Sequence, residues 1–191
     1  MTGVATTVVD ASAEDCAASK FSSMYARSMS KQAKEKNITD HTTIRINDHS
    51  LYYLTTRDLR VPILGFAQRD WRIKVTWFKS VVDNSIFIYF SDTAECDETH
   101  PVKPKSVVAS AHTVWKFQTL PMIGEIPQTK VIFTSKVDVG GAVPSAIMNR
   151  LVTRMVRNIS DMRKLFDKSK DVDAYRRLVI VEKMTKLDSS R

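Results

Sequence analysis

The chain has 191 residues, of which 43% are hydrophobic and 26% are charged, and its formal net charge is +8. This length fits one domain with a single sizeable core, and the composition is that of an ordinary globular protein. No apolar run approaches the ~20 residues of a transmembrane helix, and the first residues lack the basic start and apolar core of a secretory signal. We therefore expect a cytoplasmic protein.

The start of the chain predicts one strand followed by helical structure. Residues 5–9 form a short β-branched run. Ser12 and Asp15 then stand at the spacing of a capping box, which favours a helix start. Apolar residues continue at helical spacing to about residue 36, interrupted by serine clusters, so the pattern fits one helix or two shorter ones.

A series of strands and one long helix follow. Residues 42–46 and 51–55 flank a polar turn and predict a hairpin. Further strands are predicted at residues 71–78, 85–90, 107–117 and 129–137. Two proline-containing connections, at residues 92–105 and 119–128, separate the later strands. From residue 145 to about 169 apolar residues recur at the i, i+3, i+4 spacing of an amphipathic helix.

The junction before this helix carries the most specific motif. Gly140 and Gly141 permit a sharp turn between strand and helix, and Pro144 suits a first helical position. The D-x-x-G-x-x-P pattern of residues 138–144 resembles the closing segment of START (StAR-related lipid-transfer) domains, where it begins the C-terminal helix. The run Arg69-Asp70-Trp71 resembles the opening of an internal strand in the same family.

This resemblance implies an α+β helix-grip fold, in which a curved antiparallel sheet wraps around a long C-terminal helix. The chain would be a minimal START-like core, because it has no room for the helix and two strands that usually come first. We expect the domain to span residues 1–170 and a short helical or flexible tail to span residues 171–191.

The resemblance also implies a cavity for a lipid or similar hydrophobic ligand between the sheet and the long helix. Methionines at positions 148, 155 and 162 share one line of the helix, and flexible methionine suits an adaptable apolar wall. Ordinary core packing would produce the same stripe. The expected lining residues are Met148, Leu151, Val152, Met155, Ile159 and Met162 on the helix and Trp71, Ile73, Ala109, Ala111 and Phe133 on the strands.

The connection at residues 57–68 is unusually apolar for a loop. In START domains a flexible loop beside the cavity mouth occupies this place, so the resemblance implies a loop that admits the ligand. The residues in question are Val61, Ile63, Leu64 and Phe66. Packing of these side chains beneath the loop is the alternative.

Positive charge is concentrated near the C-terminus, where residues 145–191 contain 12 Lys and Arg against 6 Asp and Glu, a local net charge of +6. A basic stripe lies opposite the apolar one and consists of Arg150, Arg154, Arg157, Lys164 and Lys168. It is either a solvated surface or a face for an anionic membrane, which would make the protein peripheral at membranes. No RNA-binding signature accompanies the charge, so we expect no nucleic-acid partner.

Catalytic signals are missing from the sequence. The four histidines show no metal-binding spacing, Cys16 and Cys96 fit free intracellular thiols, and no nucleophile or phosphate-binding motif occurs. We therefore expect a monomeric, non-enzymatic ligand-binding protein without a metal or cofactor, acting in lipid transfer or sensing. The alternatives are a helix-grip enzyme of the cyclase or hydrolase type with a dispersed active site, and an interaction domain with a vestigial cavity.

Overall fold

The structure is a computed structural model that describes residues 2–25, 37–59, 67–141, 143 and 145–188. Within the two C-terminal helices the side chains of residues 145–147, 150, 152, 154, 155, 187 and 188 lie outside this description. The elements in chain order are β1 (Thr2–Val9), α1 (Ala13–Ser22), β2 (Ile38–Arg45), β3 (Ser50–Arg57), β4 (Arg69–Lys79), β5 (Ile86–Asp92), β6 (Val107–Ile123), β7 (Ile126–Asp138), α3 (Ser145–Leu165) and α4 (Ser169–Asp188).

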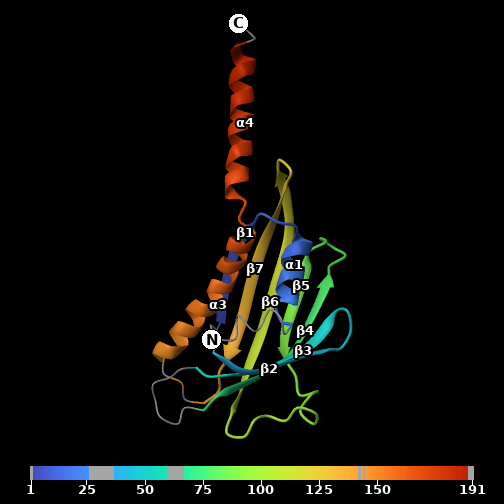
Figure 1. Cartoon of the computed structure of the whole chain (residues 1–191), viewed down its shortest axis with the longest axis vertical. Coiled ribbons are helices and arrows are strands. Elements are labelled where there is room, and N and C mark those ends of the chain that lie inside the picture. Colours follow the sequence, from blue (N-terminus) through green and yellow to red (C-terminus); the bar gives the residue numbers. More distant parts are fainter. Residues whose placement is uncertain (1, 26–36, 60–66, 142, 144, 189–191) are drawn as a thin grey trace.

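The strands form one seven-stranded sheet with the order β1-β7-β6-β5-β4-β3-β2. Neighbours in this order run antiparallel. The first residues of β4 and β6 also pair directly, in parallel, beyond the end of the shorter β5. Helices α1 and α3 contribute to one core over a single face of the sheet, which we call the inward face (Figure 1). Helix α4 extends away from the sheet.

Local sequence explains where the helices begin. The Ser12 hydroxyl accepts a hydrogen bond from the backbone N–H of Asp15 at 3.0 Å and donates one to its carboxylate at 2.7 Å, so the predicted helix start is confirmed. Helix α3 ends at Leu165, earlier than predicted. The carboxylate of Asp167 accepts from the backbone N–H of Ser169, which starts α4, and Asp10 accepts from the backbone N–H of Lys168.

The predicted loop at residues 119–128 is wrong, because β6 and β7 continue through it to a turn at Gly124. The two strands outrun their neighbours here, since β5 pairs with β6 only as far as Phe117 and β1 pairs with β7 only from Thr129. Pro121 lies in a register irregularity of the hairpin. Proline has no backbone N–H to donate, but this does not matter at a strand edge where no neighbouring strand would accept the hydrogen bond. Proline is therefore not a reliable sign of a loop here.

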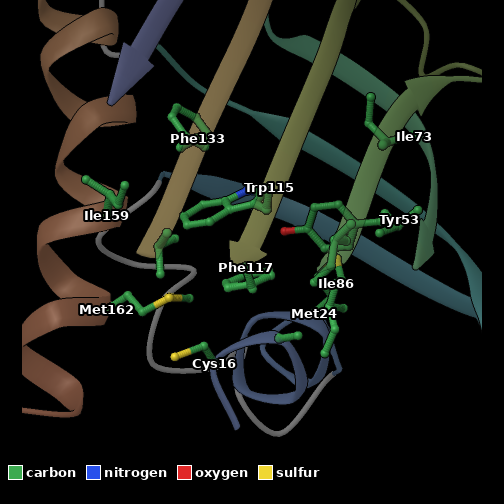
Figure 2. Close-up of a cluster of buried hydrophobic side chains, with 14 of the residues drawn as sticks. Cys16, Met24, Tyr53, Ile73, Ile86, Trp115, Phe117, Phe133, Ile159 and Met162 are labelled. Carbon is green, nitrogen blue, oxygen red and sulfur yellow. The ribbon is translucent and has the colours of Figure 1, made fainter. Parts of the chain in front are cut away.

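The hydrophobic core lies between the inward face and the two helices (Figure 2). Cys16 from α1, Met162 from α3 and Phe117 from β6 meet at one end of it. Phe117, Trp115, Leu51 and Ile88 are among the largest fully buried side chains. Among the described helices, none is long and apolar enough to cross a membrane.

Candidate ligand cavity

The inward residues of β6 become smaller along the strand. Phe117 and Trp115 are large and buried, whereas Thr113, Ala111 and Ala109 follow at alternate positions. Side chains of a strand point to alternate faces, so these five residues share the inward face. The shrinking side chains leave space between the sheet and the helices.

That space is a cavity of about 210 Å³ covered by the end of α1 and by α3. Its apolar wall consists of Met24, Leu59, Trp71, Ile73, Phe90, Ala111, Trp115, Phe133, Val137, Val139 and Leu151. Its polar wall consists of Lys20, Ser23, Tyr53, Thr55, Arg57, Asp58, Thr113, Ser135 and Asn158. We call this region the cavity half of the inward face. The region around Phe117, Ile86, Val131 and Cys16 is the packed half.

Strand β3 supplies three polar residues to the cavity at alternate positions. Tyr53, Thr55 and Arg57 lie across from Ile73, Trp71 and Arg69 of β4 in the antiparallel register. Thr55 is only 1% exposed, and its hydroxyl has no hydrogen-bond partner among the described residues. By contrast, the hydroxyls of Thr113 and Ser135 lie 2.6 Å apart and satisfy each other.

Two cations lie against aromatic rings of the cavity wall. The guanidinium carbon of Arg57 lies 5.1 Å from the ring centre of Trp71. The Lys20 ammonium reaches from α1 to 4.8 Å from the ring centre of Trp115 and 5.5 Å from that of Phe90. At these distances the ring quadrupoles attract the positive charges.

Tyr53 adds a hydroxyl that stays protonated. Figure 2 shows this hydroxyl directed toward the Trp115 side of the core. Burial raises the pKa of Tyr53, and the nearby Arg57 charge and hydrogen bond offset only part of that rise. The phenol can therefore donate a hydrogen bond to a ligand at neutral pH.

The structure distributes the residues that the sequence suggested for the cavity. Five of them line it, namely Trp71, Ile73, Ala111, Phe133 and Leu151. Ala109, Ile159 and Met162 are buried in the core but are not among the described lining residues, and Met148 is half-buried against the core. The side chains of Val152 and Met155 lie outside the described ones. That these residues bind a ligand stays a prediction.

The other two predicted surfaces are only partly described. Val61, Ile63, Leu64 and Phe66 lie outside the described residues. The flanking residues Arg57, Asp58 and Leu59 do line the cavity. On α3 and just after it, Arg157, Lys164 and Lys168 are exposed, whereas the side chains of Arg150 and Arg154 lie outside the description.

The two motifs that carry the family resemblance contact each other. Arg69 is 3% exposed, and its guanidinium donates to the backbone carbonyls of Val139 at 2.9 Å and Gly140 at 3.2 Å. Gly140 and Gly141 have φ values of 66° and 68°, which glycine adopts without strain. A Cβ on Gly140 would also lie 2.7 Å from the Val107 side chain. The junction between β7 and α3 is thus fixed at one end of the cavity.

Several charged residues of the strands pair with groups outside the cavity. Arg72 is buried, but its guanidinium pairs with Asp97 at 2.6 Å and with two carbonyls of the connection after β5. Lys74 pairs with Glu95 and Lys116 with Asp83. The cavity residues Lys20, Thr55 and Asn158 were missed. Alternation along β3 does not single out Thr55, because this strand is largely buried on both faces.

The described residues offer little for catalysis or metal binding. They contain no group of three or more His, Cys, Asp or Glu side chains that could hold a metal ion. His112 lies 3.3 Å from the Asp92 carboxylate, but its side chain is 59% exposed and it does not line the cavity. The arrangement is suited to enclosing a mostly apolar molecule that carries a polar group.

Solved structures of START domains share this fold. The human StarD13 (DLC2) lipid transfer and protein localization domain superposes with a TM-score of 0.62 at 9% identity, covering 87% of this chain and 77% of that one. Human StAR-related lipid transfer protein 5 gives 0.61 at 18% identity, with coverages of 86% and 76%. A STAR-related lipid transfer protein from Xanthomonas axonopodis gives 0.63 at 15% identity, with coverages of 86% and 85%.

No family model matches the sequence, and no curated protein sequence matches it. The likeness is therefore one of structure, and it shows the fold. The chain has the START helix-grip fold, as its two motifs predicted.

Proposed function

We propose that the protein binds one lipid, or a similar hydrophobic molecule, in the cavity between the sheet and α3, for transfer or sensing and without catalysing a reaction. The main support for this proposal is the cavity itself, which lies between the sheet and α3 and is lined mostly by aromatic and aliphatic side chains. Concave, mostly apolar pockets with few polar groups are the usual sites for small ligands. The fold neighbours named above are lipid transfer proteins by name, which supports the same class of ligand.

The volume of the cavity favours a small ligand or one with a single chain. Ligand pockets typically measure ~300–1,000 Å³, and this one is smaller, about 210 Å³. A molecule with two long acyl chains would need the cavity to expand substantially. One chain with a compact head group fits the observed space more closely.

Native mass spectrometry of protein purified from cells tests the proposal. We expect a mass increment from a non-covalent ligand, which is lost on denaturation and identified by lipid analysis. The same preparation of an Ala111→Phe variant, which fills the cavity, should lack the increment while remaining folded. An empty wild-type protein that also fails to take up added amphiphiles would contradict the proposal.

We further propose that transfer includes weak docking to anionic membranes through the basic stripe of α3. Arg157, Lys164 and Lys168 are exposed, which such docking requires. Each basic residue near an anionic surface contributes about 1 kcal/mol, and salt weakens the attraction. Co-sedimentation with anionic and neutral vesicles at low and high salt tests this. Binding that ignores both lipid charge and salt would exclude a role for the stripe.

A further inference from the structure

The polar groups of the cavity are unevenly satisfied. Thr113 and Ser135 bond to each other, whereas the Thr55 hydroxyl and the Nε of Arg57 have no hydrogen-bond partner among the described residues. Burying a hydroxyl without a partner is costly, and buried polar groups in native proteins nearly always have a hydrogen-bond partner. The two unsatisfied groups share one face of β3 two positions apart, so both can reach one ligand group.

The charge of the cavity wall favours an anion. Among the described lining residues, Lys20 and Arg57 carry positive charge and Asp58 carries negative charge. Asp58 is exposed, so water screens its carboxylate, while Arg57 is half-buried against Trp71. The field inside the cavity is therefore positive on balance, and it acts in surroundings of lower dielectric than water.

We propose that the bound molecule is a single-chain amphiphile with an anionic head group, of which a fatty acid is the simplest case, and that Arg57 and Thr55 bind that head. This inference rests on the proposed function and names its ligand class. The guanidinium of Arg57 donates to an anionic oxygen, and the Thr55 hydroxyl donates to the same head group. Lys20 adds positive charge from the α1 side, and the apolar chain lies along Trp71, Ile73 and Phe133.

Hydrogen bonds to charged groups explain why head-group charge would discriminate between ligands. An anionic head would satisfy the Thr55 hydroxyl and the Arg57 Nε, which have no hydrogen-bond partner within the described part of the chain, and bonds to a charged group are stronger than those between neutral groups. A neutral alcohol of the same chain length retains the apolar contacts and can accept a hydrogen bond from the guanidinium, but it lacks the negative charge that would make that bond an ion pair. The expected preference for the acid over the alcohol is about 10- to 100-fold in Kd.

The test compares decanoic acid with 1-decanol and with decyl phosphate on the whole protein. Trp71 and Trp115 line the cavity, so their fluorescence reports occupancy directly. Wild type should bind either anion at least tenfold more tightly than decanol, and the two anions together show which head group fits better. Arg57→Gln and Lys20→Met should remove most of that preference, because each should weaken the binding of the anions more than the binding of decanol.

Lys116→Gln is the matched control for the charge change. Lys116 also carries one positive charge and contacts an aromatic ring, Phe87, but it pairs with Asp83 and does not line the cavity. This variant should keep the wild-type preference for anions. Decanol binding and thermal unfolding, measured on every variant, show whether the cavity is still intact.

The outcomes separate the two proposals. Equal binding of acid and alcohol by wild type, or an equal loss of both in Arg57→Gln, would overturn the anionic head group and leave the lipid-binding proposal standing. A wild-type preference that Lys116→Gln also removes would overturn the assignment to Arg57 and Thr55. If no amphiphile binds and none co-purifies, the proposed function fails and this inference fails with it.

Discussion

The packed half and the cavity half of the inward face are built on the same strands but serve different ends. In the packed half, Ile86, Phe117 and Val131 face each other across β5, β6 and β7 and are buried. At a distance of four positions along each of these strands, the corresponding row lies beside the cavity and consists of Phe90, Thr113 and Ser135. Stability and ligand binding should therefore respond to different substitutions.

The largest expected effect is the loss of a packed aromatic ring. Phe117→Ala should lower the free energy of unfolding by about 3–5 kcal/mol, because the residue is fully buried and leaves a void. Phe90→Ala, beside the cavity and half-buried, should cost less than half as much. Urea unfolding of both variants measures the difference. Equal losses would show that the cavity half is packed as tightly as the other.

Two alanines on one strand test the boundary of the cavity. Ala109 is buried in the core, so Ala109→Ile should cost about 1–3 kcal/mol through overpacking. Ala111 lines the cavity, so Ala111→Ile should change stability by less than about 1 kcal/mol. Only the Ala111 variant should lose amphiphile binding while remaining stable. The reverse pattern would place the cavity beside Ala109 and not beside Ala111.

Two buried threonines should respond to valine with opposite signs. The Thr129 hydroxyl donates to the carbonyl of Ala11 at 2.7 Å, so Thr129→Val should destabilise the protein by about 1–2 kcal/mol. Thr55 has no such partner among the described residues, so Thr55→Val should raise the free energy of unfolding by about 1 kcal/mol. Thermal or urea unfolding without ligand decides this. A clear loss in Thr55→Val would mean that its hydroxyl is satisfied.

The last and most local prediction concerns the reactivity of the Cys16 thiol. Burial, with a smaller contribution from the Asp15 charge, raises the pKa of Cys16 to about 12. At pH 8 only ~10⁻⁴ of such a thiol is ionised, so alkylation of native Cys16 should be very slow and should accelerate as pH rises.

The labelling rate of Cys16 also shows whether a substitution loosens the packed half of the inward face or only the cavity half. In a Cys96→Ser background, Phe117→Ala should speed the labelling of Cys16, whereas Ala111→Ile should not. Cys16 and Phe117 lie at the same end of the core (Figure 2). Ala111 lines the cavity instead. Fast labelling of the otherwise unchanged protein at pH 8 would show that Cys16 is not held in a packed half.

Regular patterning made most of the fold predictable from sequence. The β2–β3 hairpin, the Ser12 cap and the long amphipathic helix depend on local spacing, which neighbouring residues determine. The hairpin extension of β6 and β7 was not predictable in this way. Pro121 and Pro127 are ordinary loop signals, and they are accommodated only because the flanking strands stop short.

The polar side of the cavity was less accessible from sequence. Strand β3 is largely buried on both faces, so alternation alone does not tell which of Leu54, Thr55 and Thr56 faces the helices. Lys20 lies on a different element from the rings that it contacts, and only tertiary packing brings α1 over Trp115. The apolar walls were easier, because Trp71, Ile73 and Ala111 belong to strands with clear alternation.

The bond between Arg69 and the β7–α3 junction has a consequence for the order of folding. Arg69 is separated from its two acceptors by 70 and 71 positions in the sequence. A long loop must therefore close before these hydrogen bonds form. The two partners become neighbours only once β4 and β7 occupy their places in the sheet. We therefore expect the start of α3 to be anchored late, after the sheet, as is usual for contacts of large sequence separation. The cavity would then acquire its last wall at the end of folding, and until that moment its apolar floor would face water.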